Sequence, residues 1–236
     1  MNLVLFSEAD FIGENLIAIR DHRRLEHIKH IHQIKLDDTL KVGLVNGNIG
    51  SGHVVFFNEA EIHLTVSLTQ APPTPLPVTL VLALPRPKML KRTLQTIATL
   101  GVKKIYLINS YRVEKSYWQT PLLEADAITG HLLIGLEQGC DTQLPEVHLI
   151  KRFKPFVEDD LADIVGTTRA LVAHPYTELA CPAQIDYAIT LAIGPEGGFI
   201  PYEIDLLQKC GFTAVNLGER IMRVETVVSY LLGRLY

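Results

Sequence analysis

Two stretches near the C-terminus decide the fold: Ile193-Gly194-Pro195-Glu196-Gly197-Gly198-Phe199 and Leu217-Gly218-Glu219-Arg220-Ile221-Met222-Arg223-Val224-Glu225-Thr226. Each follows an apolar run, at 187–193 and at 213–217, of the kind that forms a buried strand. Their glycines have no Cβ atom, so the backbone can turn tightly and approach a ligand closely. Two such strand ends can lie side by side at the carboxyl edge of a parallel sheet, where open α/β sheets bind ligands.

The residues from position 78 onward alternate between strand-like and helix-like runs. Strands are expected at 78–83, 104–108, 148–151, 170–173, 187–193 and 213–217. Helices are expected at 88–100, 117–137, 156–164, 202–209 and 224–235. Gly101 and Gly211 are typical helix stops, and Gly130 is expected to break the second of these helices. This alternation predicts an α/β fold with a parallel sheet.

The N-terminal part of the chain has a different pattern. Three short β-like runs, at 40–45, 52–57 and 62–68, are separated by turn residues, and the run 23–33 is helical in pattern. We therefore expect a small β-barrel over residues 1–70. Four prolines in Gln70-Ala71-Pro72-Pro73-Thr74-Pro75-Leu76-Pro77 exclude a helix and keep the chain extended. Residues 71–77 are interpreted as a linker to a second domain at 78–236.

Composition is that of a globular protein. The chain has 236 residues, of which 47% are hydrophobic. No apolar run reaches the ~20 residues that a membrane helix needs, so no membrane partner is expected. Cys140, Cys181 and Cys210 are odd in number and widely spaced, which argues against a disulfide framework and favours the reducing cytoplasm. The histidines lack the cysteines and spacing of a zinc site, and no metal is expected.

The two loop motifs, G-P-E-G-G-F and L-G-x-R-I-(L/M)-R-x-E-T, resemble the C-terminal signature of the SPOUT methyltransferases. They are most similar to the bacterial small-subunit rRNA uridine-N3 methyltransferase family. The resemblance covers 187–236 best, is fainter over 78–186 and is weakest over 1–70. It implies a trefoil-knotted α/β domain that binds S-adenosylmethionine (SAM) and pairs as a homodimer. It also implies an N-terminal PUA-like barrel that binds RNA, with the small ribosomal subunit as partner.

The same resemblance implies which residues contact the cofactor. They lie in three loops that follow predicted strands. The expected contacts are Ala173, His174 and Pro175, then Gly194, Pro195, Glu196 and Gly197, then Leu217, Gly218, Ile221, Met222, Arg223 and Thr226.

Glu196 and Arg223 are the candidate catalytic residues. Arg223 is expected to stabilise the uracil oxygen as N3 loses its proton, because arginine is nearly always charged and is a poor base. Glu196 is expected to position the cofactor or the base. The structural alternatives are a surface arginine paired with Glu219 or Glu225, and a carboxylate that favours the N-terminus of the 202–209 helix. The residue that takes the proton is left open.

Basic residues are the candidates for RNA contacts, although the net charge of −4 is unusual for a protein that binds nucleic acid. A local basic face can exist on such a chain. One basic segment, 20–32, contains Arg23 and Arg24. Another follows the first strand of the large domain, where the turn with Arg86 and Lys88 resembles the entrance turn of the family. The alternative for that turn is a solvated helix start.

The chain departs from the family pattern on the RNA side. The family motifs are changed at Ile31-His32-Gln33 and Asp37-Asp38, at Thr99-Leu100-Gly101, at Asn109-Ser110-Tyr111-Arg112, and at Glu137-Gln138-Gly139-Cys140-Asp141, which lacks the arginines that follow it in the family. The cofactor motifs are kept, so the reaction type is expected to hold while the exact nucleotide stays open. The alternatives are methylation of another RNA position, such as a ribose 2′-hydroxyl, and a non-catalytic RNA-binding or ribosome-assembly factor on the same fold.

Overall fold

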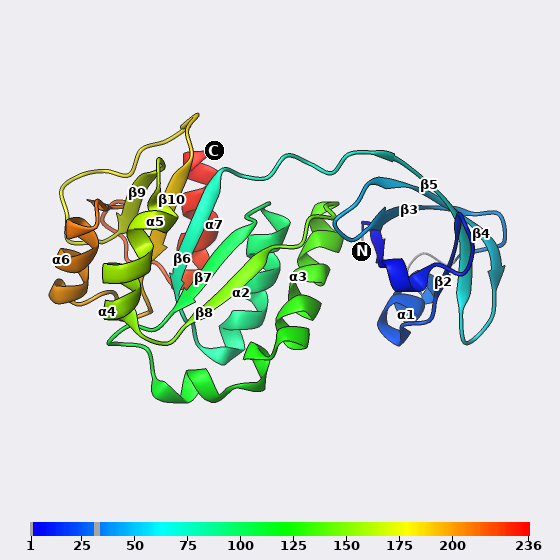
Figure 1. Cartoon of the computed structure of the whole chain (residues 1–236), viewed down its shortest axis with the longest axis horizontal. Helices are drawn as coiled ribbons and strands as arrows, with labels where there is room; N and C mark the ends of the chain where they lie inside the picture. The colour runs from blue at the N-terminus through cyan, green and yellow to red at the C-terminus, as the bar shows by residue number, and fades with distance from the viewer. Residues whose placement is uncertain (1, 31–33) are drawn as a thin grey trace. The chain divides into compact units, whose positions relative to one another are not determined.

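The computed structural model describes residues 2–30 and 34–236, and the chain forms two compact units (Figure 1). The N-terminal unit contains Met1–Thr74 and Leu132–Leu144, and the C-terminal unit contains Pro75–His131 and Pro145–Tyr236. The boundary after Thr74 lies inside the proline-rich segment. Residues 132–144 group with the N-terminal unit, whereas the sequence pattern assigns them to the second domain.

A six-stranded sheet forms the centre of the C-terminal unit, in the order β11-β9-β10-β6-β7-β8, with every pair parallel. Its strands are β6 (Val78–Ala83), β7 (Lys104–Ile108), β8 (Glu146–Ile150), β9 (Arg169–Ala173), β10 (Ile189–Ile193) and β11 (Thr213–Val215). The central strands β6 and β10 are mostly apolar and buried, as expected where helices cover both faces of a parallel sheet. The predicted parallel α/β sheet is confirmed.

Helices lie between these strands and after the last of them. They are α2 (Pro87–Thr99), α3 (Ala125–Gly139), α4 (Phe153–Pro155), the π-helical η4 (Phe156–Asp160), α5 (Leu161–Val165), α6 (Pro201–Lys209) and α7 (Val224–Leu235). Figure 1 shows α2 and α7 on one side of the sheet and α4 and α5 on the other. α2 begins at a proline and buries Leu90, Leu94 and Ile97, whose spacing places them on one face. Within residues 2–30 and 34–236, no helix is both long and apolar enough to cross a membrane.

The segment 117–137 differs from the predicted helix. Two short 3-10 turns precede α3, namely η2 (Lys115–Gln119) and η3 (Pro121–Leu123). Pro121 lacks the backbone N–H that a helix interior needs, so it opens a new turn. The expected break at Gly130 is wrong, because this residue lies inside α3. Burial of Ile128 and Leu132 on either side of it outweighs the weak helix propensity of a single glycine.

The N-terminal unit contains a five-stranded mixed sheet in the order β1-β3-β4-β5-β2, with one helix α1 (His22–His30) and a 3-10 turn η1 (Glu8–Asp10). Its strands are β1 (Val4–Phe6), β2 (Leu16–Ile19), β3 (Thr39–Leu44), β4 (Ile49–Phe57) and β5 (Ile62–Gln70). β1 pairs with β3 in parallel, and the other pairs are antiparallel. The sequence predicts only β3, β4 and β5, because β1 and β2 are short apolar runs without alternation. The end of the predicted helix, at 31–33, lies outside the described residues.

Candidate functional site

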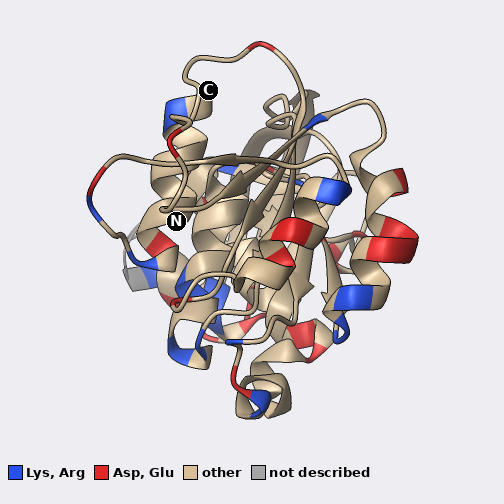
Figure 2. Cartoon of the chain, turned by 90° about the vertical axis from the view of Figure 1, so that its left-hand side faces the viewer, with Lys and Arg blue, Asp and Glu red and all other residues tan. Residues whose placement is uncertain are grey.

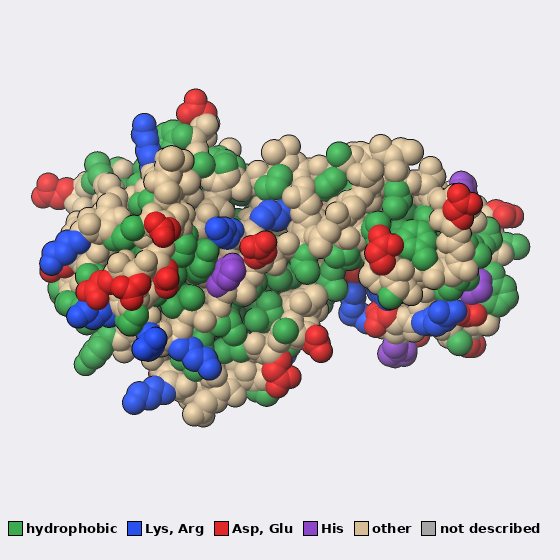
Figure 3. Space-filling model, viewed as in Figure 1, with side chains coloured by type: hydrophobic (Ala, Val, Ile, Leu, Met, Phe, Trp, Pro, Cys, Tyr) green, Lys and Arg blue, Asp and Glu red, His purple; other side chains and the backbone are tan. Residues whose placement is uncertain are grey.

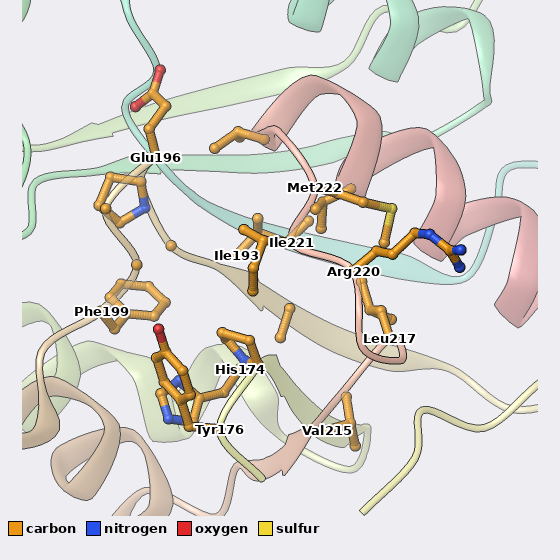
Figure 4. Close-up of a pocket in the computed structure, with 18 of the residues that line it drawn as sticks. His174, Tyr176, Ile193, Glu196, Phe199, Val215, Leu217, Arg220, Ile221 and Met222 are labelled. Carbon is orange, nitrogen blue, oxygen red and sulfur yellow. The ribbon is translucent and has the colours of Figure 1, made fainter.

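Three neighbouring strands end together at one edge of the large sheet. Register pairs Ile193 at the end of β10 with Ala173 at the end of β9, and Ala173 with Val215 at the end of β11. The loops that follow these strands therefore start side by side, and they enclose a cavity of about 180 Å³ (Figure 4). This is the carboxyl edge of a parallel sheet, where α/β folds place their ligands.

Most of the predicted cofactor residues line this cavity. They are Ala173, His174, Pro175, Gly194, Pro195, Glu196, Gly197, Leu217, Gly218, Ile221 and Met222. Arg223 and Thr226 are not among its lining residues: both side chains are exposed at the start of α7, where Arg223 is the N-cap residue. Their cofactor contacts, and the catalytic role of Arg223, remain predictions.

The cavity is also lined by residues that were not predicted from the sequence. They are Arg112, Tyr176, Ile193, Gly198, Phe199, Val215, Arg220, Val224 and Val227. Phe199 and Arg220 stand inside the quoted motifs, so their positions could have been included. Arg112 and Tyr176 follow β7 and β9 in loops without a motif, and only the fold brings them to the cavity.

Backbone geometry explains the glycines of the first loop. A Cβ atom on Gly194 would lie 3.0 Å from the backbone nitrogen of Phe199, which is tighter than ordinary packing. Gly198 has a φ of +73° and its N–H donates to the carbonyl of Pro195 at 2.7 Å, closing a tight turn. Arg112 donates to the carbonyl of Gly197. Close contacts therefore leave no room for a side chain at Gly194 or Gly197, and Gly198 is set by its backbone conformation.

The loop after β11 is held by Asn216. Its side-chain amide donates to the carbonyl of Thr177 at 2.6 Å, and its side-chain oxygen accepts from the N–H of Gly218 at 3.1 Å. Gly218 has a φ of +97°, a conformation that favours glycine. Asn216 therefore ties the loops that follow β9 and β11 to each other.

His174 and Tyr176 form the wall that follows β9. Their rings meet edge to face, with centroids 5.5 Å apart. Burial lowers the pKa of His174, so its imidazole is neutral at neutral pH. Tyr176 is 86% exposed, which puts a free aromatic face at the mouth of the cavity.

Glu196 lies at the boundary of the cavity. Figure 4 shows its carboxylate turned away from the apolar side chains that line the interior. The carboxylate instead pairs with Arg86, whose Nε lies 3.5 Å from Oε1. Arg86 is the N-cap residue of α2, and Lys88 is exposed in the first turn of that helix. The structure thus brings the predicted RNA turn next to the predicted catalytic carboxylate.

A second carboxylate, Glu203, is buried beside this site. It is 3% exposed and accepts from the backbone N–H of Tyr111 at 2.7 Å and of Ile200 at 3.0 Å. The bonds fasten the loop after β7 to the first turn of α6. Because Arg112 follows Tyr111 directly, the same carboxylate sets where Arg112 meets the glycine loop.

The predicted RNA residues of the N-terminal unit are engaged within that unit. Arg23 forms a two-pronged ion pair with Glu137, at 2.7 and 2.9 Å. Arg24 donates to both carboxylate oxygens of Asp10 and to the carbonyl of Leu5. Their RNA contacts remain predictions, and both side chains have clear structural roles. His32, in the same basic segment, lies outside the described residues.

Charges of both signs are interspersed on the surface. Figure 3 shows acidic and basic side chains intermixed on the face that it presents, and Figure 2 marks residues of both signs along the ribbon. This mixture agrees with the net charge of −4. In the described part of the chain, no group of three or more His, Cys, Asp and Glu residues is arranged to hold a metal ion.

Comparison with known proteins gives consistent relatives. The RNA methyltransferase domain family matches residues 72–236. The Ribosomal RNA small subunit methyltransferase E of Treponema pallidum is 30% identical over 233 residues, which covers 96% of this chain and 87% of that protein. The Ribosomal RNA small subunit methyltransferase E 1 of Borreliella burgdorferi is 26% identical over 227 residues, which covers 96% and 93%.

Solved structures share the fold. The Ribosomal RNA small subunit methyltransferase E of Neisseria gonorrhoeae, solved with bound SAM, has a TM-score of 0.74 at 18% identity, and covers 98% of this chain and 95% of its own. A Legionella pneumophila protein described as a methyltransferase, solved in complex with SAM, has a TM-score of 0.76 at 19% identity, with the same coverage.

Proposed function

This chain belongs to the SPOUT-class RNA methyltransferase family, and from that premise we propose that it is a SAM-dependent enzyme that methylates N3 of a uridine in small-subunit ribosomal RNA. One observation carries the proposal. The residues that the family resemblance assigns to SAM come from three separate loops, and most of them line one cavity at the carboxyl edge of the sheet. Chance would not bring together motif residues that are so far apart in the chain.

The lining residues fit SAM. Apolar side chains of Leu217, Ile221 and Met222 suit the adenine ring, and the glycine loops expose backbone donors and acceptors that can read its edge. Glycine is required at Gly194, where a Cβ atom would meet Phe199, and is favoured at Gly218, whose φ is positive. A neutral His174 avoids repulsion with the positive sulfonium.

The chemistry sets what the protein residues must do. When bound, SAM supplies a methyl group activated by its sulfonium. Neutral uridine N3 is a poor nucleophile, so the protein has to favour loss of its proton and hold the resulting anion in place. Glu196, at the cavity boundary, can accept that proton, and Arg223 can stabilise the negative charge on the uracil oxygens. Both assignments are part of the proposal.

The proposal extends to architecture and location. Residues 78–236 would form the trefoil-knotted SPOUT domain, and residues 1–70 a PUA-like barrel that binds the RNA of the small ribosomal subunit. The five-stranded sheet of the N-terminal unit supports the second part. We further propose a homodimer in the cytoplasm. Ile221, 72% exposed, and Tyr230, 42% exposed on α7, are apolar surface that a partner subunit would cover.

The decisive experiment maps modified nucleotides. Ribosomal RNA from a strain that lacks this protein would be compared with wild-type RNA by mass spectrometry of its fragments. Purified protein and SAM would then be added to the unmodified small subunit. We expect one uridine to gain a methyl group on its base. A methyl group on a ribose would support the 2′-hydroxyl alternative instead of N3. SAM binding without methylation of any RNA would favour the non-catalytic alternative.

A further inference from the structure

A polar cluster lies at the same sheet edge as the cavity and is not explained by cofactor binding. It comes from loops after three adjacent strands: Arg86 follows β6, Tyr117 follows β7 in η2, and Glu196 follows β10. Arg86 Nε lies 3.5 Å from Glu196 Oε1. The Tyr117 hydroxyl donates to Glu114 Oε1 at 3.1 Å.

The strand order β10-β6-β7 places the loops that carry Glu196, Arg86 and Tyr117 next to one another. Burial and the hydrogen bond to Glu114 raise the pKa of the Tyr117 hydroxyl. The negative charges of Glu114 and Glu196 raise it further, while the positive charge of Arg86 opposes them. The influence of both residues on the hydroxyl agrees with that placement. With a raised pKa it stays protonated, and so remains a hydrogen-bond donor at neutral pH.

Glu196 links this cluster to the cavity. The residue belongs to the cavity wall, yet its carboxylate points away from the apolar interior (Figure 4). A group held by the cluster would therefore lie next to the cavity opening. Such a position suits an acceptor that must meet a methyl group bound inside.

We propose that Arg86, Glu196 and Tyr117 form the subsite for the acceptor base and read the Watson–Crick edge of uracil. This edge presents an acceptor, a donor and an acceptor: O2, N3–H and O4. The cluster presents the complement, with donors on Arg86 and Tyr117 and an acceptor on Glu196. The inference rests on the proposed function, and it adds the residues that choose the base.

The same pattern discriminates against cytosine. Cytosine has an acceptor at N3 and an amino donor at C4, so it would set a lone pair against the Glu196 carboxylate and an amino group against a donor. A site that hydrogen-bonds its substrate rejects a base that leaves those polar groups unpaired more strongly than one that lacks an apolar contact. The Tyr117 hydroxyl would exchange Glu114, which is exposed, for a uracil oxygen.

The arrangement also serves the reaction. As the N3–H bond breaks, its proton passes to the Glu196 carboxylate and from there to solvent. The electron pair left on N3 forms the new bond to the methyl carbon, and the pair of the methyl–sulfur bond stays on sulfur. Negative charge spreads onto O2 and O4 during this change, where Arg86 and Tyr117 donate. Hydrogen bonds aimed at developing charge lower the barrier.

Tyr117→Phe tests the subsite, because it removes only the hydroxyl. The matched control is Tyr202→Phe, on a half-exposed tyrosine of α6. The substrate is small-subunit RNA from the deletion strain, and the measurement is the single-turnover rate with SAM and RNA saturating. We expect Tyr117→Phe to lower that rate roughly 10- to 100-fold, as for loss of a hydrogen bond to a charged group. SAM affinity by calorimetry and the melting temperature should match wild type.

An atomic substitution in the RNA identifies the contact. A sulfur at position 2 or 4 of the target uracil is a weaker acceptor than oxygen. At one of these two positions, the effect of Tyr117→Phe should shrink toward that of the Tyr202→Phe control. Arg86→Gln is a second variant. Its effect on the rate should likewise shrink when sulfur replaces oxygen at the other position, so that the two changes are not additive.

The outcomes separate this inference from the proposed function. If wild-type protein methylates no uracil at N3, the proposed function fails and the subsite fails with it. If wild type methylates N3 but Tyr117→Phe and Arg86→Gln react at the wild-type rate, only the subsite is overturned. Effects on rate that remain additive with both sulfur substitutions would also overturn it, since they indicate an indirect structural role.

Discussion

Gly194 is the position where a single added carbon should matter most. A Cβ atom there would lie 3.0 Å from the nitrogen and 3.1 Å from Cδ2 of Phe199. Gly194→Val must therefore displace Phe199 and the loop that lines the cavity. We expect SAM affinity, measured by calorimetry, to fall at least tenfold, or about 1.4 kcal/mol.

Gly130→Ala is the control for that experiment. It lies inside α3, and a Cβ atom there would meet nothing within 4 Å. Alanine should raise the free energy of unfolding by about 0.5–1 kcal/mol and leave SAM binding unchanged. Equal SAM affinity in Gly194→Val and wild type would show that the loop does not bind the cofactor.

Arg23 and Arg20 offer a contrast between a buried and an exposed ion pair. Glu137, the partner of Arg23, is 3% exposed, so Arg23→Ala would leave a buried carboxylate without its cation. We expect a loss of about 2–3 kcal/mol in the free energy of unfolding, less than the ~3–5 kcal/mol for a fully buried pair because Arg23 is itself half exposed. Arg20→Ala, which removes a surface pair with Glu61, should cost under about 1 kcal/mol. Urea unfolding measures both, and equal losses would refute the assigned role of Glu137.

Individual residues of the site could be predicted only where a local motif held them. The glycine loop and the loop after β11 can be identified from the sequence, because their glycines and arginines are close together in it. Arg112, Tyr117 and Tyr176 stand in loops with no comparable pattern. Their relation to the cavity depends on the strand order of the sheet, which a single sequence does not specify.

At the scale of elements, the buried strands and longer helices of the C-terminal unit were the predictable part. α7 spans the predicted 224–235, since its apolar spacing is regular and Arg223 precedes a clear helical run. Four short elements were not predicted. The strands β1 and β2 and the turns η2 and η3 carry too few residues for a periodic pattern, and tertiary contacts fix their conformation.

Glu203, in the first turn of α6, links that helix to the loop after β7. Glu203 accepts from the N–H groups of Tyr111 and Ile200, and its burial makes those bonds costly to lose. Glu203→Ala should loosen the loop after β7, which is seen as faster hydrogen exchange at Tyr111, and should weaken SAM binding through Arg112. Asp205→Ala, exposed on the same helix, is the control. Hydrogen exchange at Tyr111 as slow in Glu203→Ala as in wild type would show that Glu203 does not hold this loop.

At the scale of the whole molecule, the comparisons confirm the family that the two C-terminal motifs indicated. They leave the knot, the barrel and the assembly as proposals. These features depend on how distant segments thread and pair, and neither composition nor periodicity encodes that information.

Assembly is testable directly. Light scattering at micromolar concentration should give twice the chain mass of 26.3 kDa. In a two-fold dimer the same surface of both subunits forms the interface, so one substitution places two charges in it. Tyr230→Asp on α7 should therefore shift the mass toward the monomer, whereas the Tyr202→Asp control on α6 should not. A monomeric wild-type protein would contradict the proposed dimer.

The division of the N-terminal unit has a consequence for how the protein is made. Its second part, Leu132–Leu144, is synthesised only after Pro75–His131, the first segment of the C-terminal unit. Until those residues leave the ribosome, Arg23 lacks its ion-pair partner Glu137. The Gly47 carbonyl likewise lacks the hydrogen bond that the Thr142 hydroxyl donates to it. Domains commonly fold in order during translation, N-terminal first. All five strands of the N-terminal sheet are made by residue 70, but the unit is complete only at residue 144, so the nascent sheet lacks the contacts of its last segment until then.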